Sequence, residues 1–182
     1  CVFCLIMVPA YYFSNQNSYY YGSSHIFSAG TQYGDDTAYI ESTFGIKDSY
    51  VMMIPNVSDQ TERALVEDMK KDNNVISVTS LADMIGPGIP RDMIPDSIKS
   101  KLCGTHYNRL VLSVGVPYEG DETFALVKSL REKAQKYYGD DYYLAGQGVS
   151  TYDLMDTITA DMEKVNLVAI GAVFVVLLLT MS

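Results

Sequence analysis

Hydrophobic positions in this chain form two uncharged runs at the ends and short periodic segments between them. Residues 1–10 and 167–181 carry no charged side chain. A helix needs about 20 apolar residues to cross a bilayer core, and a buried core helix would normally keep a polar stripe that the second run lacks. The first run also lacks the basic flank of a signal peptide. We therefore expect residues 1–12 to end one transmembrane helix and residues 165–182 to start the next, both truncated in a piece of a longer protein.

Between these runs, the hydrophobic periods predict six elements in the order strand, helix, strand, strand, helix, strand. Strands are expected at 49–54, 75–79, 107–116 and 141–145, and helices at 59–71 and 123–138. Two shorter helices are expected at 35–44 and, inside an otherwise irregular stretch from 81 to 103, at 95–102. Two split βαβ units in this order predict an α+β fold of the ferredoxin-like type, a βαββαβ sandwich with both helices on one face of an antiparallel sheet.

Periodicity also indicates which side chains are buried. The third strand is expected to bury Leu110, Leu112, Val114 and Val116. The two long helices are expected to bury Leu65, Val66, Met69, Phe124, Val127, Leu130 and Ala134. Asp59, with Glu62 three residues later, resembles a capping box. A last helix is expected to start at Ser150 or Thr151, capped by that side chain, and to run unbroken into the membrane.

The net charge and the distribution of Lys and Arg indicate what the middle segment does not bind and on which side of the membrane it lies. The 182 residues include 22 acidic and 13 basic side chains, a net charge of −9, which argues against nucleic-acid binding. No Lys or Arg precedes Lys47, and the segment ahead of the last run is mainly acidic. Because cytoplasmic flanks are enriched in Lys and Arg, we expect residues 13–164 to form an extracytoplasmic domain of a multi-pass plasma-membrane protein.

Four strings carry a resemblance to a known family: residues 40–45 (IESTFG), 85–90 (IGPGIP), 118–120 (YEG) and 146–153 (GQGVSTYD). In order and spacing they resemble the porter domain of resistance-nodulation-division (RND) transporters, more closely the MMPL-type members, over nearly the whole chain. The resemblance implies proton-driven export of hydrophobic, lipid-like or drug-like substrates. It also implies a lipid bilayer and a second porter domain, of the same chain or another subunit, as partners. The proton-relay carboxylates of the family lie in a later span.

No signature of a catalytic site is present in the sequence. Gly-x-Ser-x-Gly, Walker and Rossmann motifs are missing, and His25 and His106, the only histidines, lack the spacing of metal ligands. Cys1 and Cys4 have a redox spacing, but in an apolar run they are expected to pack in the membrane. We therefore expect no enzymatic activity, cofactor or metal.

Two features are candidates for a role in transport. Asp161 falls near the apolar stripe of the last helix and Asp156 on a more polar face, so either is a candidate for coupling; the alternative is a solvated helix face. Ile89 and Met93 lie in a Gly- and Pro-rich loop, where apolar side chains can face a substrate or a neighbouring domain; the alternative is packing over the sheet.

The sequence thus predicts the porter domain of an MMPL-like exporter. A ligand-sensing or scaffolding ectodomain of a membrane-anchored protein, without transport activity, is the alternative, because fold alone does not separate the two.

Overall fold

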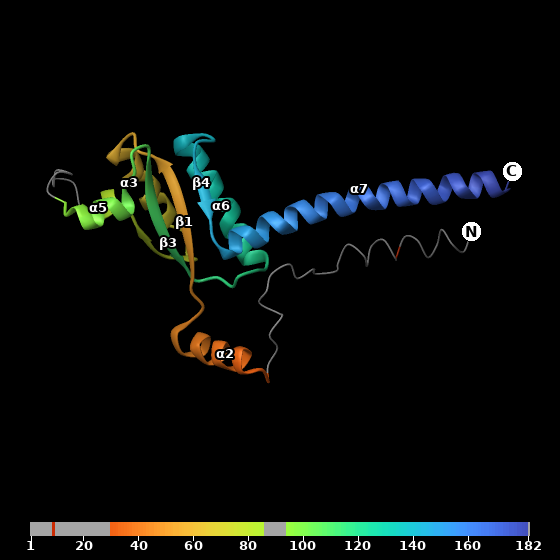
Figure 1. Ribbon diagram of the computed structural model, residues 1–182, viewed down its shortest axis with the longest axis horizontal. Helices are drawn as coiled ribbons and strands as arrows, with labels where there is room; N and C mark the ends of the chain where they lie inside the picture. The colour runs from red at the N-terminus through yellow and green to blue at the C-terminus, as the bar shows by residue number, and fades with distance from the viewer. Residues whose placement is uncertain (1–8, 10–29, 86–93, 182) are drawn as a thin grey trace.

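The computed structural model describes residues 9, 30–85 and 94–181 of the chain (Figure 1). The expected first transmembrane helix, His25, Ile89 and Met93 therefore lie outside the described residues. The elements are α2 (Gln32–Phe44), β1 (Asp48–Pro55), α3 (Asp59–Lys70), β2 (Val75–Thr79), α4 (Leu81–Ile85), α5 (Asp96–Leu102), β3 (Tyr107–Val114), α6 (Asp121–Tyr138), β4 (Tyr143–Ala145) and α7 (Gln147–Met181).

The four strands form one sheet in the order β2-β3-β1-β4, and every neighbouring pair is antiparallel. β1 lies at the centre and pairs with β3 from Asp48↔Val114 to Pro55↔Tyr107. β1 and β2, joined through α3, are parallel and have β3 between them; β3 and β4, joined through α6, are parallel and have β1 between them. The predicted α+β class is therefore confirmed, with a four-stranded antiparallel sheet.

The core lies between one face of this sheet and the helices α3 and α6. Strand alternation places every second residue of β1 and β3 on that face. The two helices add apolar stripes, and the buried hydrophobic residues of this core are Tyr50, Met52, Ile54, Leu65, Val66, Met69, Val75, Val78, Leu110, Leu112, Val114, Val116, Leu126, Val127, Leu130, Ala134 and Val149. On the opposite face Met53 is 38% and Tyr143 56% exposed, so this side is open at these two paired positions.

Two predictions inside the domain were wrong in part. Phe124 is only half-buried, whereas Thr123 and Leu126 are buried beside the expected Val127, Leu130 and Ala134. The stretch expected to be irregular begins with a helix, α4, whose Asp83 N–H is bonded by the Ser80 hydroxyl oxygen at 3.1 Å. The short helix expected at 95–102 is present as α5.

The predicted capping box at the start of α3 is also wrong. The N-cap is Ser58, whose hydroxyl oxygen accepts from Thr61 N–H at 3.4 Å. Glu62 is 1% exposed and accepts from the Asn108 amide at 2.7 Å and from Ala82 N–H at 3.1 Å. The carboxylate therefore joins α3 to β3 and to α4, because these buried donors are within reach and the helix end is already capped.

Helix α2 makes little contact with the rest of the domain. It begins after the cap Thr31, three residues before the expected start, and ends at Gly45, whose φ of 75° favours glycine. None of its residues is buried, and Tyr33, Ile40 and Phe44 form an exposed apolar stripe. In Figure 1 it lies below the sheet, beside the first residues of β1.

The buried bonds of Glu62 predict a large effect of its removal. Glu62→Ala leaves the Ala82 N–H unpaired and removes the shorter of the two hydrogen bonds of the Asn108 amide, whose other acceptor is Asn56 Oδ1 at 3.4 Å. We therefore expect the free energy of unfolding to fall by about 2–3 kcal/mol. Glu67→Ala, at an exposed position of the same helix, is the control and is expected to change it by less than about 0.5 kcal/mol. Urea unfolding followed by near-ultraviolet circular dichroism measures both. Equal losses in the two variants would contradict the role given to Glu62.

Candidate functional site at the joint of the sheet and the long helix

The helix α7 is a single element of 35 residues that follows β4 after Gly146. Figure 1 shows it leaving the sheet domain as one rod, so the prediction of an unbroken helix is confirmed. The predicted start was wrong: the helix begins at Gln147, and Thr151 does not cap it, because its hydroxyl donates to the Gln147 carbonyl at 3.1 Å within the first turn. Ser150 N–H likewise donates to the Gly146 carbonyl at 3.0 Å.

The buried residues of α7 lie in its first two turns. Val149 and Thr151 are buried and Tyr152 is half-buried, whereas Leu154 is already 45% exposed. The apolar side chains from Val165 to Leu179 are exposed as well. By length and composition α7 is the one helix of the described residues that could cross a membrane. We call its packed segment, residues 147–153, together with the residues that contact it, the joint.

Asp48 connects the central strand to the first turn of α7. It is the first residue of β1 and is 9% exposed. One carboxylate oxygen, Oδ2, accepts from Gly148 N–H at 3.3 Å, across 100 positions of sequence, and Oδ1 accepts from its neighbour Ser49 N–H at 2.7 Å. The first N–H groups of a helix have no partner inside the helix and favour a negative charge. Asp48 supplies both the acceptor and the charge.

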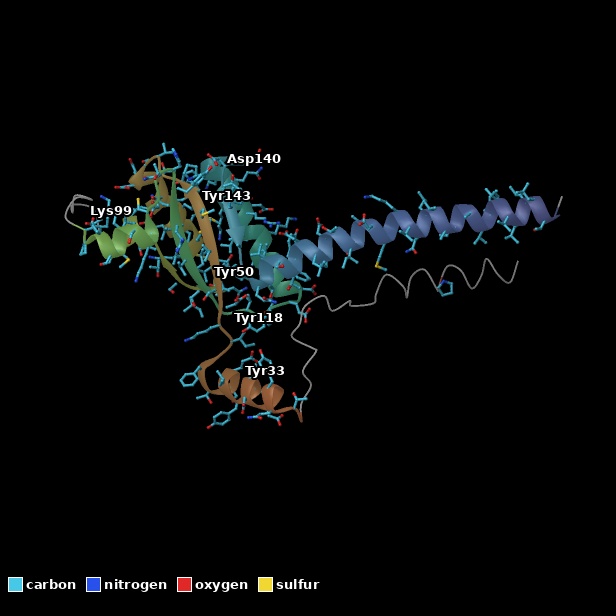
Figure 2. All side chains as sticks on the ribbon, in the orientation of Figure 1. Tyr33, Tyr50, Lys99, Tyr118, Asp140 and Tyr143 are labelled. Carbon is cyan, nitrogen blue, oxygen red and sulfur yellow. The ribbon has the colours of Figure 1, made fainter. Side chains whose placement is uncertain are left out.

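Tyr50 fills the space between β1 and α7, as Figure 2 shows. A Cβ atom at Gly146 would clash with the Tyr50 ring, and one at Gly148 would clash with the Tyr50 hydroxyl and with the Thr123 methyl group. The string Gly146-Gln-Gly148 is therefore required because the backbone approaches this ring so closely. Burial raises the pKa of the Tyr50 phenol, and the charge of Asp48 raises it further.

A second set of contacts holds the next turn of α7 against α6. The Arg131 guanidinium bonds both carboxylate oxygens of Asp153, at 2.7 and 2.9 Å, and lies 5.5 Å above the Tyr152 ring. The Tyr152 ring lies 5.7 Å from that of Phe124. The hydrogen bonds to Asp153 raise the pKa of Arg131. Such two-pronged Arg–carboxylate pairs fix orientation as well as distance, so α7 is held from the strand side and from the helix side.

The residues predicted from sequence lie away from this joint. Asp156 and Asp161 are on α7 beyond its packed turns, and both are exposed. Asp161 forms an ion pair with Lys164 at 3.4 Å, and their side chains are 66% and 75% exposed. That placement fits the alternative of a solvated helix face, and a coupling role for either residue stays a prediction. Ile89 and Met93 lie outside the described residues.

Sequence reasoning missed Asp48, Tyr50 and Arg131. A signal for the first two exists: Asp48, Tyr50, Met52 and Ile54 alternate along one strand, so an acid and a phenol occupy inward positions. Starting the strand at residue 49 concealed Asp48. For metal binding, His106 is exposed, and the described residues contain no cluster of three or more His, Cys, Asp or Glu able to hold an ion.

Because Tyr50 lies so close to Gly148, we expect a Gly→Ala substitution to have opposite effects on the free energy of unfolding at two glycines of α7. Gly148→Ala forces Tyr50 or the helix to shift, so we expect a loss of about 1–3 kcal/mol in the free energy of unfolding. Gly171→Ala, where a Cβ meets nothing within 4 Å, is the control and is expected to stabilise the helix slightly. Thermal unfolding of both variants tests this. If Gly148→Ala is as stable as the control, the joint is not closely packed.

A scan against protein-family models finds none that matches the chain, and a search of curated proteins finds no similar one.

Proposed function

We propose that the chain is the extracytoplasmic porter domain of a proton-driven MMPL/RND-like membrane exporter of hydrophobic, lipid-like or drug-like substrates. The observation that carries the proposal is the joint: a sheet domain is held on two sides to the first turns of a helix whose far part is long, apolar and exposed. Such an arrangement suits a domain that moves together with a membrane helix. The proton-driven step and the class of substrate come from the family resemblance.

The topology supports the same family. Read from the other edge, the strand order is β4-β1-β3-β2, with two interleaved split βαβ units and both long helices on one face. We propose that the domain is a ferredoxin-like sandwich, the fold that the resemblance to RND porter domains implies, and this strand order supports that proposal. Fold alone does not specify transport, so the topology supports the proposal only together with the joint.

The exposed side chains of α7 support a membrane location. An exposed apolar helix in water carries a large penalty, about 25 cal/mol for each Å² of apolar surface, and a bilayer removes it. The acidic segment before the apolar run and the lack of Lys and Arg before Lys47 place residues 13–164 outside the membrane in our proposal. The protein would then be a multi-pass protein of the plasma membrane, with α7 continuing into one of its spans.

Two uncovered surfaces support a second porter domain, of the same chain or another subunit, as the partner. The first is the open face of the sheet, where Met53 and Tyr143 are exposed. Beside Tyr143, the Tyr107 ring is fixed edge-on at 5.6 Å, with its hydroxyl bonded to Asp141 at 2.9 Å. The second is the apolar stripe of α2. A neighbouring domain that covered both would also give α2 the packing that a helix of this length needs in water.

In the proposed function the joint transmits movement of α7 to the sheet domain. A helix with unbroken backbone hydrogen bonds transmits a tilt or shift along its length, and the residues of the joint pass that displacement to β1 and α6. Substrate would travel past or between the porter domains as these move. The domain itself would perform no chemistry, and the energy would come from proton movement through another part of the transporter.

Interrupting the rod tests the proposal. In the full-length protein, Met162→Pro removes a helix hydrogen bond and costs about 3 kcal/mol or more locally, between the joint and the apolar run. We expect export of a lipophilic fluorescent dye from energised cells to fall to the background rate, while the protein remains inserted at its normal level. Met162→Leu keeps the helix and is the control. Dye export at full rate in Met162→Pro would overturn the coupling role of α7.

The coding sequence on both sides of residues 1–182 separates the exporter from its alternative. Further spans, one of them with an Asp or Glu inside it, and a second strand-helix repeat are expected for the exporter. A soluble signalling domain directly after this segment, without further spans, would leave the ligand-sensing or scaffolding ectodomain as the better account.

A further inference from the structure

The hydroxyl of Tyr50 is buried at the start of α7 and has no hydrogen-bond partner in the part of the chain that the structure describes. A buried polar group without a hydrogen-bond partner lowers the stability of the folded state. A Phe at this position would fill nearly the same space without that cost. The Tyr50 hydroxyl therefore lowers the stability of the arrangement described. A hydroxyl that forms a hydrogen bond only in a second arrangement would have this effect in the first.

Asp48 is the acceptor best placed to be that partner. Asp48 and Tyr50 are two positions apart on β1, so both side chains point to the same buried face. Both also reach the same residue of α7: the Asp48 carboxylate accepts from Gly148 N–H, and the Tyr50 hydroxyl lies against the Gly148 α-carbon. The other nearby hydroxyl, of Thr123, donates to the Pro117 carbonyl at 2.6 Å and turns its methyl group toward Gly148.

The bond from Gly148 is one that can be exchanged. At 3.3 Å it is longer than the usual range for N–H···O bonds, whereas Ser49 N–H holds the other carboxylate oxygen at 2.7 Å. Each carboxylate oxygen can accept more than one bond. A phenol O–H bonded to a carboxylate is a short, charge-assisted bond, stronger than a neutral one, so it would compensate for the loss of the N–H.

We propose that the joint is a two-position device in which Gly148 N–H and the Tyr50 hydroxyl alternate as donors to Asp48. In the arrangement described, Gly148 is the donor and the first turn of α7 lies against β1. In the other, this turn moves off β1 and the Tyr50 hydroxyl takes the place of Gly148. Asp48 Oδ2 keeps a donor in both, and Ser49 N–H stays on Oδ1, so α7 shifts on the sheet without leaving either carboxylate oxygen unpaired. The biological role of this exchange rests on the proposed function; its existence does not.

Distance measurements between β1 and α7 test the exchange directly. Spin labels at Met53→Cys, on the open sheet face, and at Asp156→Cys, on the exposed side of α7, are placed in the full-length protein in lipid nanodiscs, with its remaining cysteines replaced by Ser. We expect two distance populations in the parent protein. Tyr50→Phe is expected to reduce the second population at least about tenfold, since it removes one charge-assisted hydrogen bond.

Tyr138→Phe is the matched control. Tyr138 carries the other buried hydroxyl without a partner among the described residues, but it lies at the end of α6, so its removal should leave both populations unchanged. One population in the parent protein, or two that persist in Tyr50→Phe, would overturn the proposal. Dye export by Tyr50→Phe tests the proposed function separately: loss of the second population with export at full rate would show that the exchange exists but does not serve transport.

Discussion

The close contact of Tyr50 with Gly146 and Gly148 is the constraint on which the rest of the structure depends. Only residues without a side chain let the start of a helix approach a tyrosine ring on the central strand this closely. The approach brings Gly148 N–H to the Asp48 carboxylate and places Asp153 opposite Arg131. The direction in which α7 leaves the sheet follows from these contacts, because one is made to a strand and the other to a helix of the same core.

The remainder of the domain supplies a rigid base for this joint. β1 is the central strand, paired on both sides, and its inward side chains are packed under α3 and α6. Glu62 fixes α3 to β3 and α4 through buried hydrogen bonds. The buried residues of α7 lie in its first two turns, and its apolar part from Val165 onward is exposed, so a displacement of that apolar part reaches the domain through the joint. A rigid base and one adjustable contact are what a coupling element requires.

Much of this fold was predictable because its elements follow simple periods. The strand at 75–79 has the predicted bounds, the apolar residues expected to be buried on α3 and β3 are buried, and the α+β class followed from the order of elements. Features that depend on distant residues were not predictable. From its spacing Glu62 resembles a capping residue, but its actual donors, Asn108 and Ala82, are distant in the sequence. From the sequence Gly146 and Gly148 resemble a loop, but they are glycines because Tyr50 leaves no room for a Cβ atom at either position. The joint was missed for the same reason, since its bond from Gly148 to Asp48 spans 100 positions of sequence.

We infer that α7 is one continuous body from the joint to the apolar run. Hydrogen–deuterium exchange of the full-length protein in lipid nanodiscs measures this directly at the amides of residues 154–164, which lie between the two. A continuous helix predicts slow exchange there, comparable with that of the first two turns of α7. Exchange of these amides within seconds, with slow exchange kept on both sides, would show that the helix is broken outside the domain and would contradict the account.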